Sequence, residues 1–122
     1  MRKILLLLIV LLLVGCNSNK IDGDALYKTI KGEIAMDFVN NSKAVLIDVR
    51  TFEEFEVNHI EGAINIPVDE ITKERLKEIT EDKLDNIIVY CRSGNRSKTA
   101  AIKIIELGYT NVFDLGSIDN WK

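Results

Sequence analysis

The sequence predicts an α/β fold in three layers, with a central parallel sheet of about five strands and helices on both faces. Apolar runs of strand length alternate along the chain with segments whose apolar residues recur at helical spacing. Two runs, residues 44–49 and 87–90, are almost continuously apolar, which is typical of parallel strands covered on both faces. The 122 residues are 47% apolar and 29% charged, which indicates one small globular domain. Strands that are joined through helices pair in parallel by right-handed crossovers.

Residues 25–122 are expected to form this domain, beginning with an edge strand at residues 27–30. A short helix is predicted over residues 33–39, followed by a turn and by the strand 44–49. The residues expected to point inward from this helix are Ala35, Phe38 and Val39.

A second helix is predicted just after Arg50, because Thr51 and Glu54 form a Thr-x-x-Glu capping box. Phe52 and Phe55 lie three residues apart and are expected on its inner face. The residues expected to face outward are Glu53, Glu54 and Glu56.

The second half of the domain continues the alternation. A third strand at residues 63–66 is stopped by Pro67, and an amphipathic helix is predicted over residues 72–79 with Leu76 and Ile79 inward. The strand 87–90 leads into a further helix, which Gly108 is well placed to end. The apolar positions that give this helix its spacing are Ala101, Ile104 and Ile105, and a last short strand is predicted over residues 112–115.

The amino end differs in kind from the rest of the chain. Arg2 and Lys3 precede eleven apolar residues, 4–14, which end in Gly15 and Cys16. A positive start, a short apolar stretch and small residues at its end predict a signal peptide over residues 1–15. Eleven apolar residues are too few to cross a bilayer, which requires about 20.

The residues Leu13 to Cys16 resemble the lipobox of bacterial lipoproteins. The resemblance implies that Cys16 carries fatty chains such as palmitate and that residues 16–24 are the lipidated Cys and a short polar tether. The protein would then be a lipoprotein of the bacterial cell envelope, anchored on the extracytoplasmic side of a membrane. The alternatives are an uncleaved anchor or an ordinary secretory signal. Lipidation would leave Cys91 as the only free thiol, so no internal disulfide could form.

Cys91 lies where the buried strand passes into a helix, at the sheet edge where open α/β sheets bind ligands. The residues that follow it are polar or Gly, so their backbone N–H groups can converge on one point together with the positive end of the helix dipole. Arg92 and Arg96 add charge, and we expect the thiol pKa to lie below the free value of about 8.5. The alternatives are a buried structural Cys and a loop that binds an anion without chemistry.

The segment Cys91-Arg-Ser-Gly-Asn-Arg-Ser97 resembles the active-site loop of the rhodanese (thiosulfate sulfurtransferase) domain. The resemblance covers nearly all of residues 27–121. Its further matching segments are 46–50 (Leu-Ile-Asp-Val-Arg), 54–55 (Glu-Phe), 59–60 (His-Ile), 62–63 (Gly-Ala), 65–67 (Asn-Ile-Pro), 107–109 (Leu-Gly-Tyr) and 115–116 (Leu-Gly).

The resemblance implies a sulfurtransferase that moves sulfane sulfur from a donor such as thiosulfate to a thiophilic acceptor through a persulfide on Cys91. Structural support is implied for Asp48 and Arg50, and we also expect His59 to be structural, because an ionised thiol needs no base. No metal or organic cofactor is required. The residues implied to hold the substrate are Arg92, Ser93, Gly94, Asn95, Arg96 and Ser97.

Two positions depart from the family pattern. Asn58 stands where Gly usually precedes the His, and because Asn tolerates left-handed backbone we expect the turn to survive. Ser117 replaces the second Gly of a Gly-Gly pair, with Trp121 close behind, which leaves the rim of the site open to change.

Two other classes of function fit the residues. One is a membrane-anchored sulfur carrier or protein-binding module without turnover. The other is a Cys-dependent phosphatase or arsenate reductase, whose loop resembles Cys-x5-Arg, whereas Cys91 to Arg96 is Cys-x4-Arg. A net charge of −3 argues against a nucleic-acid partner, while the cations of the loop favour a small anion as guest. We take the domain to be a monomer.

Overall fold

The structure is a computed structural model, and it describes residues 27–122. The predicted signal peptide, Cys16 and the tether lie outside the described residues. The strands are β1 (Lys28–Thr29), β2 (Ala44–Asp48), β3 (Ile64–Asn65), β4 (Asn86–Cys91) and β5 (Asn111–Ser117). The helices are α2 (Gly32–Asn41), α3 (Phe52–Val57), α4 (Lys73–Lys77) and α5 (Asn95–Glu106), with short 3-10 helices η2 (Val68–Glu70) and η3 (Ile118–Asn120).

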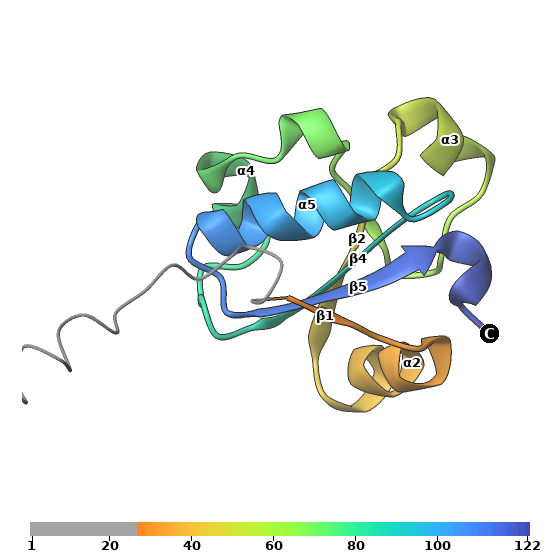
Figure 1. Ribbon diagram of the computed structural model, residues 1–122, viewed down its shortest axis with the longest axis horizontal. Helices are drawn as coiled ribbons and strands as arrows, with labels where there is room; N and C mark the ends of the chain where they lie inside the picture. Colours follow the sequence, from red (N-terminus) through yellow and green to blue (C-terminus); the bar gives the residue numbers. More distant parts are fainter. Residues whose placement is uncertain (1–26) are drawn as a thin grey trace, which may run out of the picture.

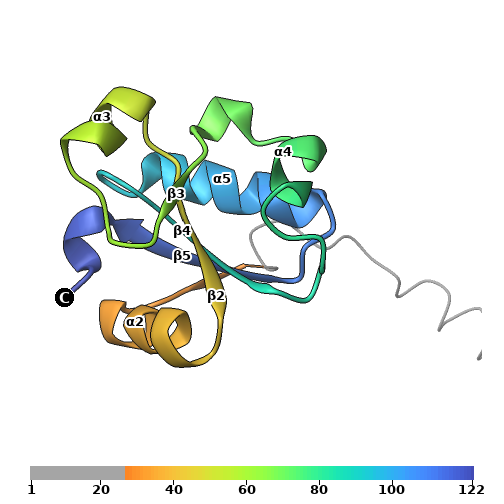
Figure 2. The same ribbon diagram turned by 180° about the vertical axis from the view of Figure 1, so that it is seen from behind.

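The five strands form one sheet in the order β1-β5-β4-β2-β3, and every pair is parallel. Helix α2 covers one face of the sheet, while α3, α4 and α5 lie over the other (Figures 1 and 2). This arrangement confirms the predicted three-layer α/β fold. The predicted edge position of the first strand is also confirmed, and β4 lies at the centre of the sheet.

The sheet separates two apolar clusters, which is why β4 carries no exposed side chain. Alternate residues of a strand point to opposite faces, so Ile87 and Val89 pack under α5 while Ile88 and Tyr90 pack toward α2. The continuous apolar run that predicted this strand thus reflects burial on both sides.

The predicted inward-facing residues are buried or partly buried, with one exception. Ala35 is fully buried in α2, and Leu76 is fully buried in α4. Gly108 follows α5 with φ of 102°, as expected for the residue that ends a helix. The prediction for Phe52 was wrong, because this side chain is 56% exposed, and Phe55 packs instead against the ring of His59.

The carboxyl ends of β2, β4 and β5 lead into the segments that build the site. Helix α3 follows β2, α5 follows β4 and η3 follows β5, so these segments gather at one edge of the sheet (Figure 1). Close packing holds η3 there, since a Cβ on Gly32 would lie 1.9 Å from the carbonyl oxygen of Asn120. None of the helices within residues 27–122 is long and apolar enough to cross a membrane.

Candidate active site

The loop between β4 and α5 encloses the sulfur atom of Cys91. Gly94 adopts a φ of 106°, which residues with a Cβ rarely adopt, and this turn aims its N–H at Cys91 Sγ over 3.0 Å. The N–H of Ser97, in the first turn of α5, reaches the same atom over 3.3 Å. The loop therefore binds the sulfur with backbone donors from both sides of the turn.

These hydrogen bonds decide the ionisation of the thiol. Burial alone would raise the pKa of Cys91, which is 0% exposed. Hydrogen bonds from the hydroxyl and N–H of Ser97 and from the N–H groups of Gly94 and Ser93 outweigh burial and lower the pKa below its ordinary value. The hydroxyl of Ser97 also lies 3.0 Å from the carbonyl oxygen of Gly94, so its hydrogen can turn to either acceptor.

A buried ion pair supports the floor of the site beside this loop. The carboxylate of Asp48, at the end of β2, accepts bonds from Arg50 Nε at 3.0 Å and from an outer guanidinium nitrogen at 2.7 Å. Both side chains are almost fully buried. The hydrogen bond to Asp48 raises the pKa of Arg50 further above its ordinary value. Asn65 donates to the carbonyl oxygens of both residues, so the turn after β2 is held from β3 as well.

Tyr90 joins this ion pair to β4. Its hydroxyl donates to Asp48 Oδ2 over 2.7 Å and accepts a bond from the N–H of Ile60 over 3.1 Å. Burial is the main cause that raises the pKa of this phenol, so it stays protonated and can keep donating. The guanidinium of Arg50 also donates to the carbonyl oxygen of Asn58, which ties the chain after α3 to the same network.

The backbone at Asn58 differs from the expectation. Its φ of −164° is extended backbone that any residue can adopt, so the predicted left-handed geometry was wrong. The position that follows α3 therefore contributes its carbonyl oxygen, and its backbone conformation requires neither Gly nor Asn.

Arg96 forms an ion pair at the site. Its guanidinium forms two bonds to the carboxylate of Glu54, at 2.6 and 3.1 Å, and the expectation that Glu54 faces outward was wrong. The predicted capping box is present, and Thr51 donates through both its N–H and its hydroxyl to the same carboxylate. The bond to Arg96 is the main cause that lowers the pKa of Glu54 to about 2.

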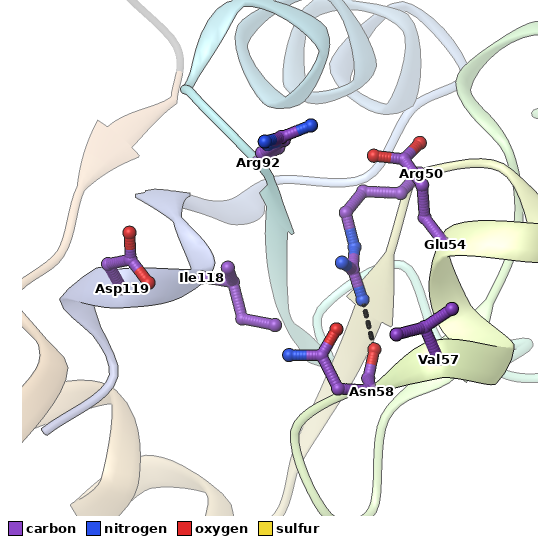
Figure 3. A pocket seen from close by; sticks show the side chains of 7 residues that line it. All are labelled: Arg50, Glu54, Val57, Asn58, Arg92, Ile118 and Asp119. Carbon is purple, nitrogen blue, oxygen red and sulfur yellow. Dashed lines mark hydrogen bonds between the residues drawn. The ribbon is translucent and has the colours of Figure 1, made fainter.

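A cavity of about 420 Å³ opens beside the loop, and Figure 3 shows the side chains around it. It lies between α3, the loop and η3. The exposed Arg92 supplies its cationic wall, and no salt bridge to Arg92 is found within the described part of the chain. Cys91 is fully buried and is not among the lining residues. The lining residues are Arg50, Glu54, Val57, Asn58, Arg92, Ile118 and Asp119.

The remaining predicted site residues lie around this cavity without lining it. Ser93 and Asn95 are exposed on the loop, whereas Ser97 is buried beneath it. His59 is exposed, its Nδ1 lies 2.8 Å from the carbonyl oxygen of Phe55, and it does not contact Cys91. Ser117, at the second departure from the family pattern, accepts a bond from the N–H of Asp119 and so begins η3.

Among residues 27–122 no three His, Cys, Asp or Glu side chains lie close enough together to hold a metal ion. Two further residues of the site, Glu54 and Tyr90, were missed by the sequence reasoning. A buried Tyr needs a partner for its hydroxyl, and Tyr90 pairs in register with Asp48 on the adjacent strand. The need for a partner was visible in the sequence, but the partner follows only from the register.

The fold and the site together define a class of protein, namely a parallel α/β domain with an ionisable thiol in a backbone N–H cradle at the carboxyl edge of its sheet. The model of the rhodanese-like domain family matches residues 33–122. The chain therefore belongs to the rhodanese-like family.

Individual relatives agree with this assignment. The chain is 43% identical over 72 residues to the thiosulfate sulfurtransferase PspE of Escherichia coli, covering 59% of this chain and 68% of that protein. It is 35% identical over 123 residues to an adenylyltransferase and sulfurtransferase of Candida albicans, covering 83% of this chain. The chain spans only 28% of the length of that second protein. Sulfur transfer is the activity that these relationships support at the level of the family.

A solved structure has the same fold. It is described as a rhodanese with anions from E. coli, and it shares 40% sequence identity with this chain at a TM-score of 0.60. The similarity covers 63% of this chain and 89% of that one.

Replacement of Tyr90 by Phe tests the network around Asp48. The change removes one of the donors to Asp48 Oδ2, which keeps its bonds from Arg50, and leaves the buried N–H of Ile60 without its acceptor. We therefore expect the free energy of unfolding to fall by about 1–3 kcal/mol. The free energy of unfolding is measured by chemical denaturation, followed through the fluorescence of the single Trp, Trp121. Tyr109→Phe is the matched control, because this residue is also almost fully buried and its hydroxyl donates only to the carbonyl oxygen of Thr80. A loss for Tyr90→Phe no larger than for the control would contradict the network.

Proposed function

We propose that the protein is a sulfurtransferase that carries sulfane sulfur as a persulfide on Cys91. The observation that supports this most directly is the pair of N–H groups aimed at Cys91 Sγ, because they favour the thiolate that the reaction needs. Membership of the rhodanese-like family and the similarity to the thiosulfate sulfurtransferase PspE support the same reaction.

In the first half-reaction the Cys91 thiolate attacks the outer sulfur of a donor such as thiosulfate. A new S–S bond forms on Cys91, the S–S bond of the donor breaks, and sulfite leaves with its electron pair. The negative charge then resides on the outer sulfur of the persulfide. The backbone N–H groups of the loop are placed to stabilise charge near this position.

In the second half-reaction a thiophilic acceptor such as cyanide attacks the outer sulfur. Thiocyanate leaves, and the bonding pair returns to Cys91 as thiolate. No proton has to be moved in either half-reaction, so the exposed His59 is given no catalytic role. Arg92 is the residue that we assign to attracting the anionic donor, because it lines the cavity with its charge available. The description of the E. coli rhodanese with anions agrees with an anionic guest.

Two rival functions make different predictions for the same cysteine. A carrier or binding module would take up sulfur slowly or not at all and would show no turnover. A phosphatase or arsenate reductase would instead hydrolyse or reduce a tetrahedral oxyanion at the thiolate. We favour sulfur transfer over the latter because the loop is one residue shorter than Cys-x5-Arg, which narrows the cradle.

Incubation of the chain, purified in detergent, with thiosulfate should add one sulfur atom to Cys91, and cyanide should remove it. Intact-mass spectrometry measures the adduct, and thiocyanate formation measures turnover. Cys91→Ser should give neither, while aryl phosphate should not be hydrolysed. Absence of any adduct on the folded wild-type chain would refute sulfur transfer. A removable adduct without turnover would assign the carrier role, and phosphate release that depends on Cys91 would assign the rival enzyme.

We also propose that the mature protein is held at the extracytoplasmic face of a bacterial membrane by fatty chains on Cys16. The support is the order of residues 2–16, with two cations, an apolar stretch and a small-residue segment before the Cys. More than one fatty chain would make the attachment stable.

The anchor is tested by growing bacteria that express the chain in medium that contains labelled palmitate. We expect label in the membrane fraction for the wild-type chain and none for Cys16→Ser. Lys20→Ser is a matched control in the same segment and should remain labelled. Equal labelling of the wild-type chain and Cys16→Ser would exclude the anchor.

A further inference from the structure

Helix α3 places a carboxylate against the loop that holds Cys91. Glu54 lines the cavity, and its two oxygens meet the guanidinium of Arg96 in a two-bond ion pair. The side chains of Glu54 and Arg96 are 27% and 34% exposed, so water screens this pair only in part. Thr51 donates two hydrogen bonds to the same carboxylate, so the position of this carboxylate does not depend on Arg96 alone.

Every segment around Cys91 contributes charge, and most of this charge is compensated. The end of β2 carries the buried pair of Asp48 and Arg50. Helix α3 and the loop contribute the pair of Glu54 and Arg96. The charged residues near the loop that form no salt bridge within residues 27–122 include Arg92 on the loop, Lys98 on the exposed side of α5 and Asp119 on η3.

We propose that Glu54 is a positioning residue that withholds the charge of Arg96 from Cys91 and from the cavity, so that Arg92 alone attracts the anionic donor. This inference rests on the proposed function, because it assumes that Cys91 is the nucleophile. It gives the second Arg of the loop a different role from the first, although both lie within five residues of Cys91.

The physical reason is the distribution of charge around one sulfur atom. An unpaired guanidinium near Cys91 would stabilise the thiolate, and the carboxylate of Glu54 cancels most of this effect. The Coulomb interaction with Cys91 is among the causes that raise the pKa of Arg96, so the two groups sense one another. A thiolate that is stabilised too strongly is a weaker nucleophile, because nucleophilicity falls as the thiol pKa falls. The ion pair therefore leaves the backbone N–H groups and the hydroxyl of Ser97, rather than full charges, to ionise the thiol.

Two substitutions separate this role from simple support of the loop. Glu54→Gln removes the negative charge while keeping a residue that fits the capping box, so Arg96 becomes uncompensated. The pH at which iodoacetamide alkylates Cys91 at half its maximal rate should fall by about half a unit at low ionic strength. Arg96→Gln leaves the carboxylate uncompensated, and the same midpoint should rise.

The diagnostic result is that the alkylation midpoint shifts in opposite directions in the two variants. If the pair only supported the loop, both substitutions would loosen the N–H cradle and shift the midpoint upward together. Glu53→Gln is the matched control, because it makes the same change in net charge one residue away and Glu53 is exposed. Its midpoint should equal that of the wild-type chain. Added salt should shrink both shifts, because these charges are partly exposed.

The Michaelis constant for thiosulfate gives a second readout. It should fall severalfold in Glu54→Gln at low salt, because the free charge of Arg96 then adds to that of Arg92 for a dianionic donor. Midpoints that move in the same direction, or a Glu54→Gln that matches Glu53→Gln in both readouts, would overturn the inference. Circular dichroism shows whether each variant is folded. If Glu54→Gln does not fold, Arg96→Gln alone still tests the inference, because an alkylation midpoint that falls or does not change in this variant would overturn it.

The proposed sulfurtransferase function and the proposed role of Glu54 can be refuted separately. If the wild-type chain takes up no sulfur from thiosulfate, the proposed function fails, whatever the alkylation midpoints are. If the wild-type chain takes up sulfur and the two variants do not move in opposite directions, only the role of Glu54 fails.

Discussion

The site depends above all on two backbone N–H groups that donate to one buried sulfur atom. They come from Gly94 and Ser97, so they exist only while the strand β4 turns directly into helix α5 through a residue with positive φ. Burial of Cys91 by itself works against ionisation, and the hydrogen bonds reverse this effect. The N–H groups belong to the backbone and act together with the hydroxyl of Ser97, so ionisation of the thiol follows from the fold of this loop, and charged side chains adjust it.

The two buried or half-buried ion pairs keep this turn in place from neighbouring segments. Asp48 and Arg50 hold the end of β2 beside Tyr90 of β4, while Glu54 connects α3 to the first turn of α5. A buried pair contributes little net stability compared with an apolar replacement, but loss of one partner leaves an uncompensated charge at a cost of about 3–5 kcal/mol. Such pairs therefore favour one arrangement of the loop over its alternatives, which suits a site where the donors must converge on one atom.

Much of this could be predicted from the sequence, and the reasons are local. The continuous apolar run before Cys91, the capping box at Thr51 and the Gly after α5 each specify their own segment, and all three are present in the structure. The errors concern which face or partner a side chain meets. Phe52 and Glu54 lie on a helix of six residues, fewer than two turns, where a 3.6-residue period barely distinguishes the inner face from the outer one.

Partners across the sheet could not be predicted in the same way. The bond between Tyr90 and Asp48 follows from strand register, and the bond between Glu54 and Arg96 joins residues 42 positions apart. The sequence reasoning counted Arg96 as a free cation because nothing local shows that a carboxylate from another helix meets it. Apolar periodicity therefore located the site, whereas its charge distribution required the three-dimensional structure.

The claim that the loop ionises Cys91 is tested most directly by the ultraviolet absorbance of its thiolate. The difference spectrum between the wild-type chain and Cys91→Ser, recorded across a pH titration of the folded protein, isolates this one sulfur atom. We predict a midpoint clearly below about 8.5, the value of a free cysteine. A midpoint at or above that value would mean that burial prevails over the N–H groups of Gly94 and Ser97, and it would contradict the account.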